Sequence, residues 1–189
     1  MAGRRSDTRE RIQRVALDLF AEQGYQKTSL REIAEKLDVT KAALYYHFKT
    51  KEDIISSLVE DLAASLDQVL EWARAQQDPV AARREFVCRI AALMEGNFTR
   101  LWLFIHENQP TLKEMHVSNA FEERMKAVFE LICGGERDPA AQLKARLAVV
   151  ALVLGNKPQV LAAADRSEVA LRVALELASP HGGRAEAAT

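Results

Sequence analysis

Cysteine, glycine and proline are scarce in this sequence of 189 residues, and it contains no long hydrophobic run. Cys88 and Cys133 stand far apart and form no Cys-x-x-Cys pair, which excludes a disulfide-rich scaffold. No apolar stretch approaches the roughly 20 residues that span a bilayer, and the basic residues near the start lead into a polar helix rather than a signal peptide. We therefore expect a cytoplasmic protein with reduced thiols.

The sequence also lacks an excess of charge of one sign, since its formal net charge is −1 at pH 7. Residues 1–57 contain 11 Lys and Arg against 9 Asp and Glu, whereas the remaining residues contain 15 against 18. The slightly basic N-terminal part is compatible with a nucleic-acid partner. Chance variation among solvated charges explains it equally well, so charge alone identifies no partner.

Signals for enzymatic chemistry are missing too. The sequence has no Gly-rich phosphate loop, no Gly-x-Ser-x-Gly nucleophile elbow and no Cys/His cluster with metal-ligand spacing. We therefore predict neither an enzyme nor a cofactor or metal site.

The residues that are abundant, Ala, Leu, Glu, Arg and Val, favour helices, and no alternating apolar–polar pattern predicts strands. Ser6 or Asp7 is the predicted N-cap of a first helix, and Gly24 is placed to end it in the left-handed conformation. Ser29 and Glu32 have the spacing of a capping box for a second helix.

A short third helix is predicted from Thr40 to Phe48 after the three-residue turn 38–40. Thr50 and Asp53 then form another capping box. Three short helices of which the last two are three residues apart are typical of a helix-turn-helix.

Apolar residues recur every four positions from Ile54 to Leu70, and the pattern persists to about Ala75. This predicts a fourth helix of roughly 26 residues, about 39 Å long. A helix of that length would link a small N-terminal domain to a second helical bundle.

Later helices are predicted over 110–132 and 139–155, the latter capped by Asp138. Asp165 and Glu168 have capping-box spacing for the last helix. The small, polar segment 181–189 is predicted to be a disordered tail.

The outward side of the third helix is unusual for a solvated surface, because it carries few acids and two adjacent tyrosines. Its residues are Thr40, Lys41, Ala42, Tyr45, Tyr46 and His47. A helix fits the DNA major groove, where Lys donates to guanine acceptors and apolar carbons contact thymine methyls. Hydroxyl groups and Lys51 are suited to phosphate oxygens. The alternative is a three-helix adaptor whose tyrosine-rich surface binds protein.

Residues 28–53, which begin with Thr-Ser-Leu-Arg-Glu-Ile-Ala and include Leu-Tyr-Tyr-His-Phe, resemble the signature of the TetR family of bacterial transcriptional regulators. The resemblance covers roughly residues 9–58. It implies an all-α fold in which a helix-turn-helix domain over 1–50 is linked by the long helix to an effector-binding and dimerisation domain over 51–180. It also implies a homodimer on double-stranded operator DNA.

Carried over by position, the resemblance implies DNA contacts at nine residues. Thr28 and Arg31 would contact the groove or phosphates, and base reading would fall to Lys41, Ala42 and Tyr45. Clamps on the DNA backbone would be Thr40, Tyr46, His47 and Lys51. Asp38 departs from the Gly that is frequent in the family's turn, but Asp tolerates left-handed geometry.

A dimer interface is predicted on the last two helices, which are more apolar than a one-sided surface helix requires. Its residues would be Leu143, Leu147, Val150, Ala151, Leu154, Val169, Val173 and Leu177. The alternative is that these residues form only an intrachain core.

A small hydrophobic effector is the predicted ligand, with a pocket drawn from the middle helices. The candidates are Trp72, Phe98, Trp102, His106, Asn108, His116, Phe121 and Met125. An ordinary aromatic core is the alternative reading of this set. We predict a repressor that an effector releases by moving the long helix, or alternatively a DNA-binding protein whose second domain binds a protein partner.

Overall fold

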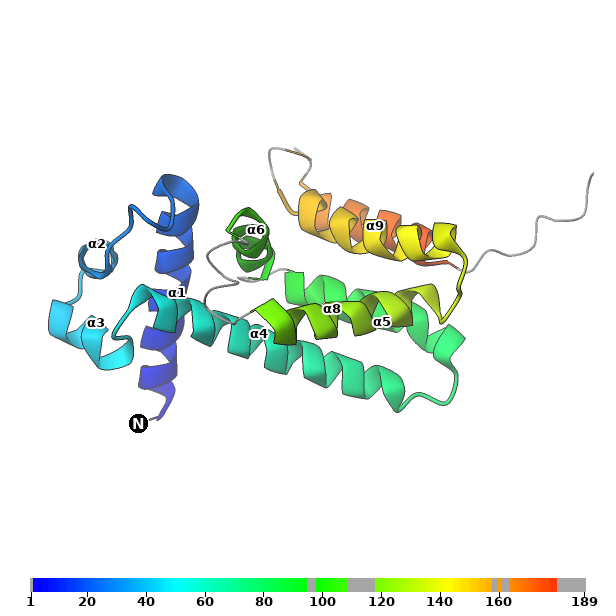
Figure 1. Ribbon diagram of the computed structural model, residues 1–189, viewed down its shortest axis with the longest axis horizontal. Coiled ribbons are helices and arrows are strands. Elements are labelled where there is room, and N and C mark those ends of the chain that lie inside the picture. The colour runs from blue at the N-terminus through cyan, green and yellow to red at the C-terminus, as the bar shows by residue number, and fades with distance from the viewer. Residues whose placement is uncertain (1, 95–97, 109–117, 158–159, 161–163, 180–189) are drawn as a thin grey trace, which may run out of the picture. The chain divides into compact units, whose positions relative to one another are not determined.

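The computed structural model describes residues 2–94, 98–108, 118–157, 160 and 164–179, and within these residues the regular structure is helical, with no strand (Figure 1). The helices are α1 (Ala2–Gln23), α2 (Leu30–Lys36), α3 (Lys41–His47), α4 (Lys51–Arg74), α5 (Pro79–Leu93), α6 (Thr99–Glu107), α8 (Ser118–Cys133), α9 (Pro139–Gly155) and α10 (Arg166–Ala178). The all-α fold that the sequence predicts is confirmed.

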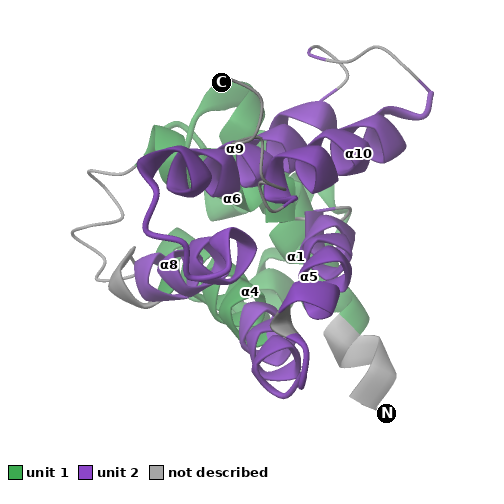
Figure 2. Ribbon diagram, turned by 90° about the vertical axis from the view of Figure 1, so that its right-hand side faces the viewer, with its two compact units in different colours: residues 1–64, 97–121 green, residues 65–96, 122–189 purple. Residues whose placement is uncertain are grey.

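The chain divides into two compact units that are not contiguous in sequence (Figure 2). Unit 1 comprises residues 1–64 and 97–121, and unit 2 comprises residues 65–96 and 122–189. The long helix α4 contributes its first fourteen residues to unit 1 and the rest to unit 2. The predicted domain limits at residues 50 and 180 stay predictions, and the predicted tail 181–189 lies outside the described residues.

Helix α1 begins at Ala2, so the predicted N-cap at Ser6 or Asp7 is wrong. Arg4 and Arg5 are good helix formers, and the helix therefore continues past the two capping residue types. At its other end the prediction is confirmed. Gly24 has a φ of 91° and its N–H donates to the carbonyl of Phe20 over 3.0 Å.

The core of unit 1 is made by apolar faces that meet around α1. Helix α1 contacts α2 and α6, and α2 contacts α3. Ile12, Ala16 and Leu17 of α1 are completely enclosed, as are Ile33 of α2 and Leu44 of α3. Helices α2 and α3, with seven residues each, are too short to be stable alone and therefore depend on this packing.

In unit 2, helix α10 packs along α9 and against α5. Small residues face each other between α9 and α10, since Ala145, Ala148, Ala170 and Ala174 are all buried. At Gly155 a Cβ atom would overlap the Cβ of Ala170, so the two helices approach closely there. Alanine and glycine therefore allow the two helices to approach closely, while Val149, Leu152 and Val153 of α9 are also buried.

Cap predictions in unit 2 have a mixed outcome. Asp138 is the N-cap of α9 and accepts the N–H of Ala141 over 3.1 Å, as predicted. Asp165 precedes α10 but makes no side-chain cap, so the predicted box with Glu168 is wrong. Its backbone, with φ −97° and ψ 22°, differs from the extended conformation in which an N-cap side chain reaches the first turn.

Candidate nucleic-acid interface

The α2–turn–α3 segment is held by caps at both helix starts. Ser29 accepts the N–H of Glu32, and the Glu32 carboxylate accepts the N–H of Ser29 over 2.7 Å, which confirms the predicted capping box. The Ser29 hydroxyl also donates to the Glu32 carboxylate over 2.7 Å, and this bond, followed by the bond from the Ser29 N–H, lowers the pKa of Glu32. Thr40 accepts the N–H of Ala43 over 3.2 Å, as expected of an N-cap. Each short helix thus begins at a position set by a side chain.

The turn between α2 and α3 depends on Asp38, which has a φ of 55°. This left-handed conformation is the one for which the family often has Gly, and Asp tolerates it better than most residues. The next residue, Val39, donates its N–H to the carbonyl of Ala34 over 3.1 Å. Asp38 therefore preserves the tight turn.

The outward side of α3 presents a mixture of a cation, a methyl group and aromatic hydroxyls. Tyr46 is 64% exposed, and Lys41 and Ala42 are exposed as well. The ammonium of Lys41 lies 5.6 Å from the ring centre of Tyr45. The rings of Tyr46 and His47 meet edge to face at 5.4 Å. These side chains form one continuous surface while Leu44 anchors the helix from behind.

Arg31 is exposed on α2, and its Nε donates to Oε1 of Glu35 over 2.7 Å. The hydrogen bond to Glu35 raises the pKa of Arg31. Glu35 was not among the residues that the sequence singled out. Its spacing of four from Arg31 is the signal that could have indicated the pair.

Thr28 lies in the interior rather than on this surface, being 2% exposed. Its hydroxyl donates to the carbonyl of Gly24 over 2.9 Å. The DNA-contacting surface that we propose below therefore excludes the Thr28 side chain. A threonine that follows a helix C-terminus is often used to satisfy the last carbonyls, and that role accounts for Thr28 here.

Lys51, at the start of α4, is bound within unit 1 by Tyr25. Its Nζ donates to the Tyr25 carbonyl over 2.7 Å and lies 4.4 Å from the centre of the Tyr25 ring. The Tyr25 hydroxyl donates to Oε1 of Glu52 over 2.6 Å. Burial, and then the bond to Glu52, raises the pKa of Tyr25, while the same bond lowers the pKa of Glu52. Tyr25 thus fixes the first turn of α4.

Two further polar residues join α1 to α4 inside unit 1. The buried amide of Gln13 donates to Ser57 Oγ over 2.9 Å and to Asp61 Oδ2 over 2.8 Å. Arg9 lies 3.6 Å from the other carboxylate oxygen of Asp61. Sequence analysis missed this network. The available signal was a glutamine in the apolar stripe of α1, where Gln13 and Leu17 are four residues apart.

The predicted effector residues are not all brought together. Phe98, Trp102, His106, Asn108 and Phe121 belong to unit 1, Trp72 and Met125 belong to unit 2, and His116 lies outside the described residues. Within unit 1, Trp102 contacts three other rings, those of Phe98 at 6.3 Å, His106 at 4.7 Å and Phe121 at 5.7 Å. Asn108 uses its amide to donate to the carbonyl of Phe104 over 2.9 Å.

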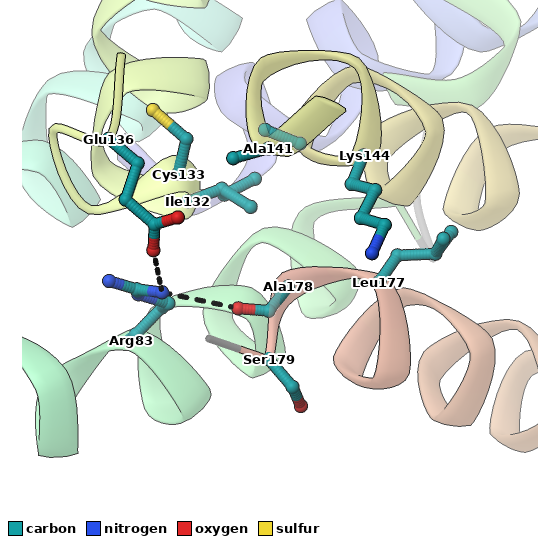
Figure 3. A pocket seen from close by; sticks show the side chains of 10 residues that line it. Arg83, Ile132, Cys133, Glu136, Ala141, Lys144, Leu177, Ala178 and Ser179 are labelled. Atoms are coloured by element: carbon teal, nitrogen blue, oxygen red, sulfur yellow. Dashed lines mark hydrogen bonds and ion pairs between the residues drawn. The ribbon is translucent and has the colours of Figure 1, made fainter. Parts of the chain in front are cut away.

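A small pocket lies elsewhere, within unit 2 (Figure 3). Arg83 lines it, contacts Glu136 at 3.9 Å and donates to the carbonyl of Ala178 over 3.5 Å. Its cavity volume of about 10 Å³ is close to what one water molecule needs, so it is too small for a drug-sized ligand. Gly134, with a φ of 66°, leaves the room that the Arg83 guanidinium occupies. None of the predicted effector residues lines this pocket.

The predicted dimer residues lie on the outer side of α9 and α10. Five large aliphatic members of this set are 38–56% exposed, namely Leu143, Leu147, Val150, Leu154 and Val173. Ala151, Val169 and Leu177 are half-buried. In this chain by itself, the fully buried residues of the two helices are others, such as Ala145, Val149 and Ala174, while Leu177 lines the small pocket of unit 2. We call the eight predicted residues together the α9–α10 apolar face.

Across the part of the chain that the structure describes, no three His, Cys, Asp or Glu residues are grouped so as to hold a metal ion. In the same residues, no helix combines the length and apolar character needed to cross a membrane. Cys88 and Cys133 are half-buried free thiols.

Comparison with known proteins places the sequence match on the helix-turn-helix. Residues 12–58 match the family described as bacterial regulatory proteins, tetR family. The HTH-type transcriptional regulator AcrR of Shigella flexneri is 40% identical over 86 residues, which are 44% of this chain and 40% of AcrR. The chain spans about two fifths of the length of the curated relatives it matches.

Solved structures extend the likeness of the fold to nearly the whole chain. The ketosteroid transcriptional regulator KstR2 of Mycobacterium tuberculosis has a TM-score of 0.69 at 15% identity, over 90% of this chain and 93% of its own. AmtR of Mycobacterium smegmatis has a TM-score of 0.66 at 26% identity, over 93% of this chain and 87% of its own. Together with the match over residues 12–58, these findings show that the chain is similar to TetR-type bacterial regulatory proteins in its N-terminal sequence and in its fold.

Proposed function

We propose that this protein is a TetR-type transcriptional regulator that binds a near-palindromic operator as a homodimer and represses transcription there. The observation that carries the proposal is the outward side of α3, where Lys41, Ala42, Tyr45 and Tyr46 form a surface without a carboxylate. A surface without negative charge does not repel the phosphates of DNA. The DNA major groove is also wide enough to hold an α-helix such as α3.

Within that surface the residues would have different roles. Lys41 and Ala42 would contact base edges together with Tyr45, whose ring lies beside the Lys41 ammonium. Tyr46 and His47 would contact phosphates, as would the hydroxyl of Thr40. Lys51 would act at the start of α4 through its charge, because Tyr25 holds its Nζ close to the protein. Arg31 would contribute from α2.

The homodimer is supported by the α9–α10 apolar face. Five large aliphatic side chains exposed on two adjacent helices form the kind of patch that monomers rarely leave uncovered. A second copy of the same hairpin would cover it and build a four-helix interface. Two-fold symmetry would then present two α3 helices to half-sites about 34–36 Å apart, one DNA turn.

A small hydrophobic effector is the proposed signal, and the Trp102 cluster supports it by its chemistry. Phe98 and Phe121 are buried aromatic side chains in contact with Trp102, and His106 is an exposed polar group on the same helix as Trp102. The similar structure KstR2 is described as a ketosteroid transcriptional regulator. To reverse occupancy from 1:99 to 99:1, an effector would need about 10⁴-fold preference for the released state.

Selection of bound sites from a random pool of DNA duplexes tests the central proposal. The expected result is a palindromic site whose affinity falls with salt at a log–log slope of about −0.9 per neutralised phosphate. Lys41→Ala should reduce the preference for that site over random DNA by roughly 1–3 kcal/mol. Lys126→Ala, an exposed lysine of α8, is the matched control and should leave the preference unchanged.

Absence of duplex binding even at low salt would refute the proposal of a DNA-binding regulator. The effector is tested separately by thermal shifts across a panel of hydrophobic compounds, with operator release as the second readout. If no compound raises the melting temperature or releases DNA, the protein-partner alternative replaces the effector.

A further inference from the structure

Arg31 and Glu35 lie one helical turn apart on the solvent-facing side of α2. Their side chains are 76% and 61% exposed and are joined by the 2.7 Å bond between Nε and Oε1. Ile33 and Ala34, between them in sequence, are buried in unit 1. The pair therefore points away from the core, and it places a carboxylate directly on one of the proposed DNA contacts.

The bond to Glu35 occupies one edge of the Arg31 guanidinium. It engages Nε and, within the described residues, leaves the two Nη groups for other acceptors. Two parallel N–H donors are what arginine uses for bidentate contact with guanine O6 and N7. Glu35 thus orients the guanidinium while leaving the donors that read a base.

The same carboxylate has the opposite effect on contact with the DNA backbone. Sequence-independent binding depends on how many phosphates the protein neutralises, because each neutralised phosphate releases counterions. A carboxylate 2.7 Å from Arg31 cancels its charge and repels neighbouring phosphates. Hydrogen bonds to a base edge depend instead on how the donors are oriented. The bond between Arg31 and Glu35 preserves the orientation of the guanidinium.

We propose that Glu35 is a specificity-determining residue, which suppresses contact of Arg31 with phosphates on random DNA and orients it for a base edge in the operator. This inference rests on the proposed function, since it requires Arg31 to face DNA. It adds a role for an acidic residue in an interface whose other proposed members carry no negative charge.

Glu35→Gln tests the proposal, because glutamine keeps an oxygen that accepts from Nε and loses the charge. Affinity for random duplex at ~0.1 M salt should rise about fivefold, and the magnitude of its log–log salt slope should increase by about 0.9. Affinity for the selected operator should change by about twofold at most. Glu35→Ala, which also removes the acceptor, should weaken operator binding about threefold relative to Glu35→Gln.

Two controls separate this role from a general effect of charge. Glu60→Gln makes the same change in net charge at an exposed position of α4, about 13 Å along the helix from Lys51. It should leave the salt slope unchanged. In an Arg31→Ala background, Glu35→Gln should no longer alter the slope, because its effect passes through Arg31.

Three outcomes would overturn the inference while DNA binding itself stands. They are an equal gain on operator and random DNA, an unchanged salt slope, and an undiminished effect in the Arg31→Ala background. Failure of the wild-type protein to select any site would instead overturn the proposed function.

Discussion

Helices α2 and α3 and helices α9 and α10 are two helix pairs built in contrasting ways. The first pair is short, and hydrogen bonds from Ser29 and Thr40 define where each helix begins. The second pair is long and joined through alanine and glycine, with Gly155 against Ala170 at the closest approach. The α2–α3 pair exposes polar and aromatic groups, and the α9–α10 pair exposes large aliphatic ones.

This contrast explains where the sequence similarity lies. The family match covers residues 12–58, whereas the remainder resembles known regulators chiefly in fold. A surface that binds phosphates and bases requires particular donors at particular positions. An apolar interface is satisfied by many combinations of aliphatic residues of suitable volume. The two functions that we propose would therefore leave a strong sequence signal in the α2–α3 pair and a weak one in the α9–α10 pair.

Leu147→Glu should have the largest effect, because it would disrupt the dimer interface that we propose on the α9–α10 apolar face. A carboxylate on a face that a partner covers must be buried without compensation. We expect the dimer dissociation constant to rise by about 100-fold or more, which corresponds to ~2.7 kcal/mol. Analytical ultracentrifugation measures it, and operator affinity should fall in parallel.

Val80→Glu is the matched control for this substitution, since Val80 is an exposed aliphatic residue of α5 outside the α9–α10 apolar face. It should leave the association state unchanged. A Leu147→Glu protein that remains a dimer at low micromolar concentration would show that the exposed aliphatic residues serve another purpose.

The sequence is sufficient to predict several helix boundaries, because caps act locally. The Ser29–Glu32 box, Gly24 and Asp138 were each predicted from residue type and spacing, and each is confirmed. The exposed aliphatic residues of α9 also follow from periodicity, once the alanines are assigned to the inner side. Local rules of this kind need no knowledge of distant residues.

A tertiary contact and two details of local conformation account for three features that the sequence could not predict. Thr28 has the residue type of a phosphate contact, yet the folded chain turns its hydroxyl to Gly24. Lys51 is held by the carbonyl and ring of Tyr25, 26 positions earlier. Asp165 has capping spacing but a backbone conformation that prevents the cap. Only Lys51 has a partner distant in sequence, whereas the Thr28 bond and the Asp165 conformation are local features that residue type and spacing do not distinguish.

Gly155→Ala should have an intermediate effect, and it tests whether small residues set the distance between α9 and α10. The added methyl group overlaps Ala170, whose Cα lies 3.2 Å from the ideal position of the new Cβ. Forced separation of the helices should lower the free energy of unfolding by about 1–3 kcal/mol. Urea denaturation measures this loss.

A second substitution tests whether overlap of the added methyl group with Ala170 causes this loss of stability. Ala170→Gly alone should cost roughly 1 kcal/mol as a glycine within a helix. The double variant should lose less free energy of unfolding than the sum of the losses in the two single variants. The space vacated at position 170 accepts the methyl group added at position 155. Strict additivity would argue against close approach of the two helices.

Tyr25→Phe should have the smallest effect, and it concerns the part of the molecule whose structure depends on polar contacts. The substitution keeps the buried ring against Phe20 and Phe104 and removes only the hydroxyl that binds Glu52. We expect a loss of about 1 kcal/mol in the free energy of unfolding at pH 7, because the acceptor carboxylate is largely exposed to water. Leu147→Glu should not affect this contact.

The pH dependence of that loss identifies its origin. The Tyr25 hydrogen bond lowers the pKa of Glu52 in the folded state, so its contribution is complete above the ordinary carboxyl pKa and disappears as pH falls through the lowered value. The stability difference between wild type and Tyr25→Phe should therefore be constant from about pH 5 to 8 and shrink at more acidic pH. A difference that persists unchanged at acidic pH would locate the effect in ring packing instead, and the start of α4 would then depend on apolar contacts, as the α9–α10 pair does.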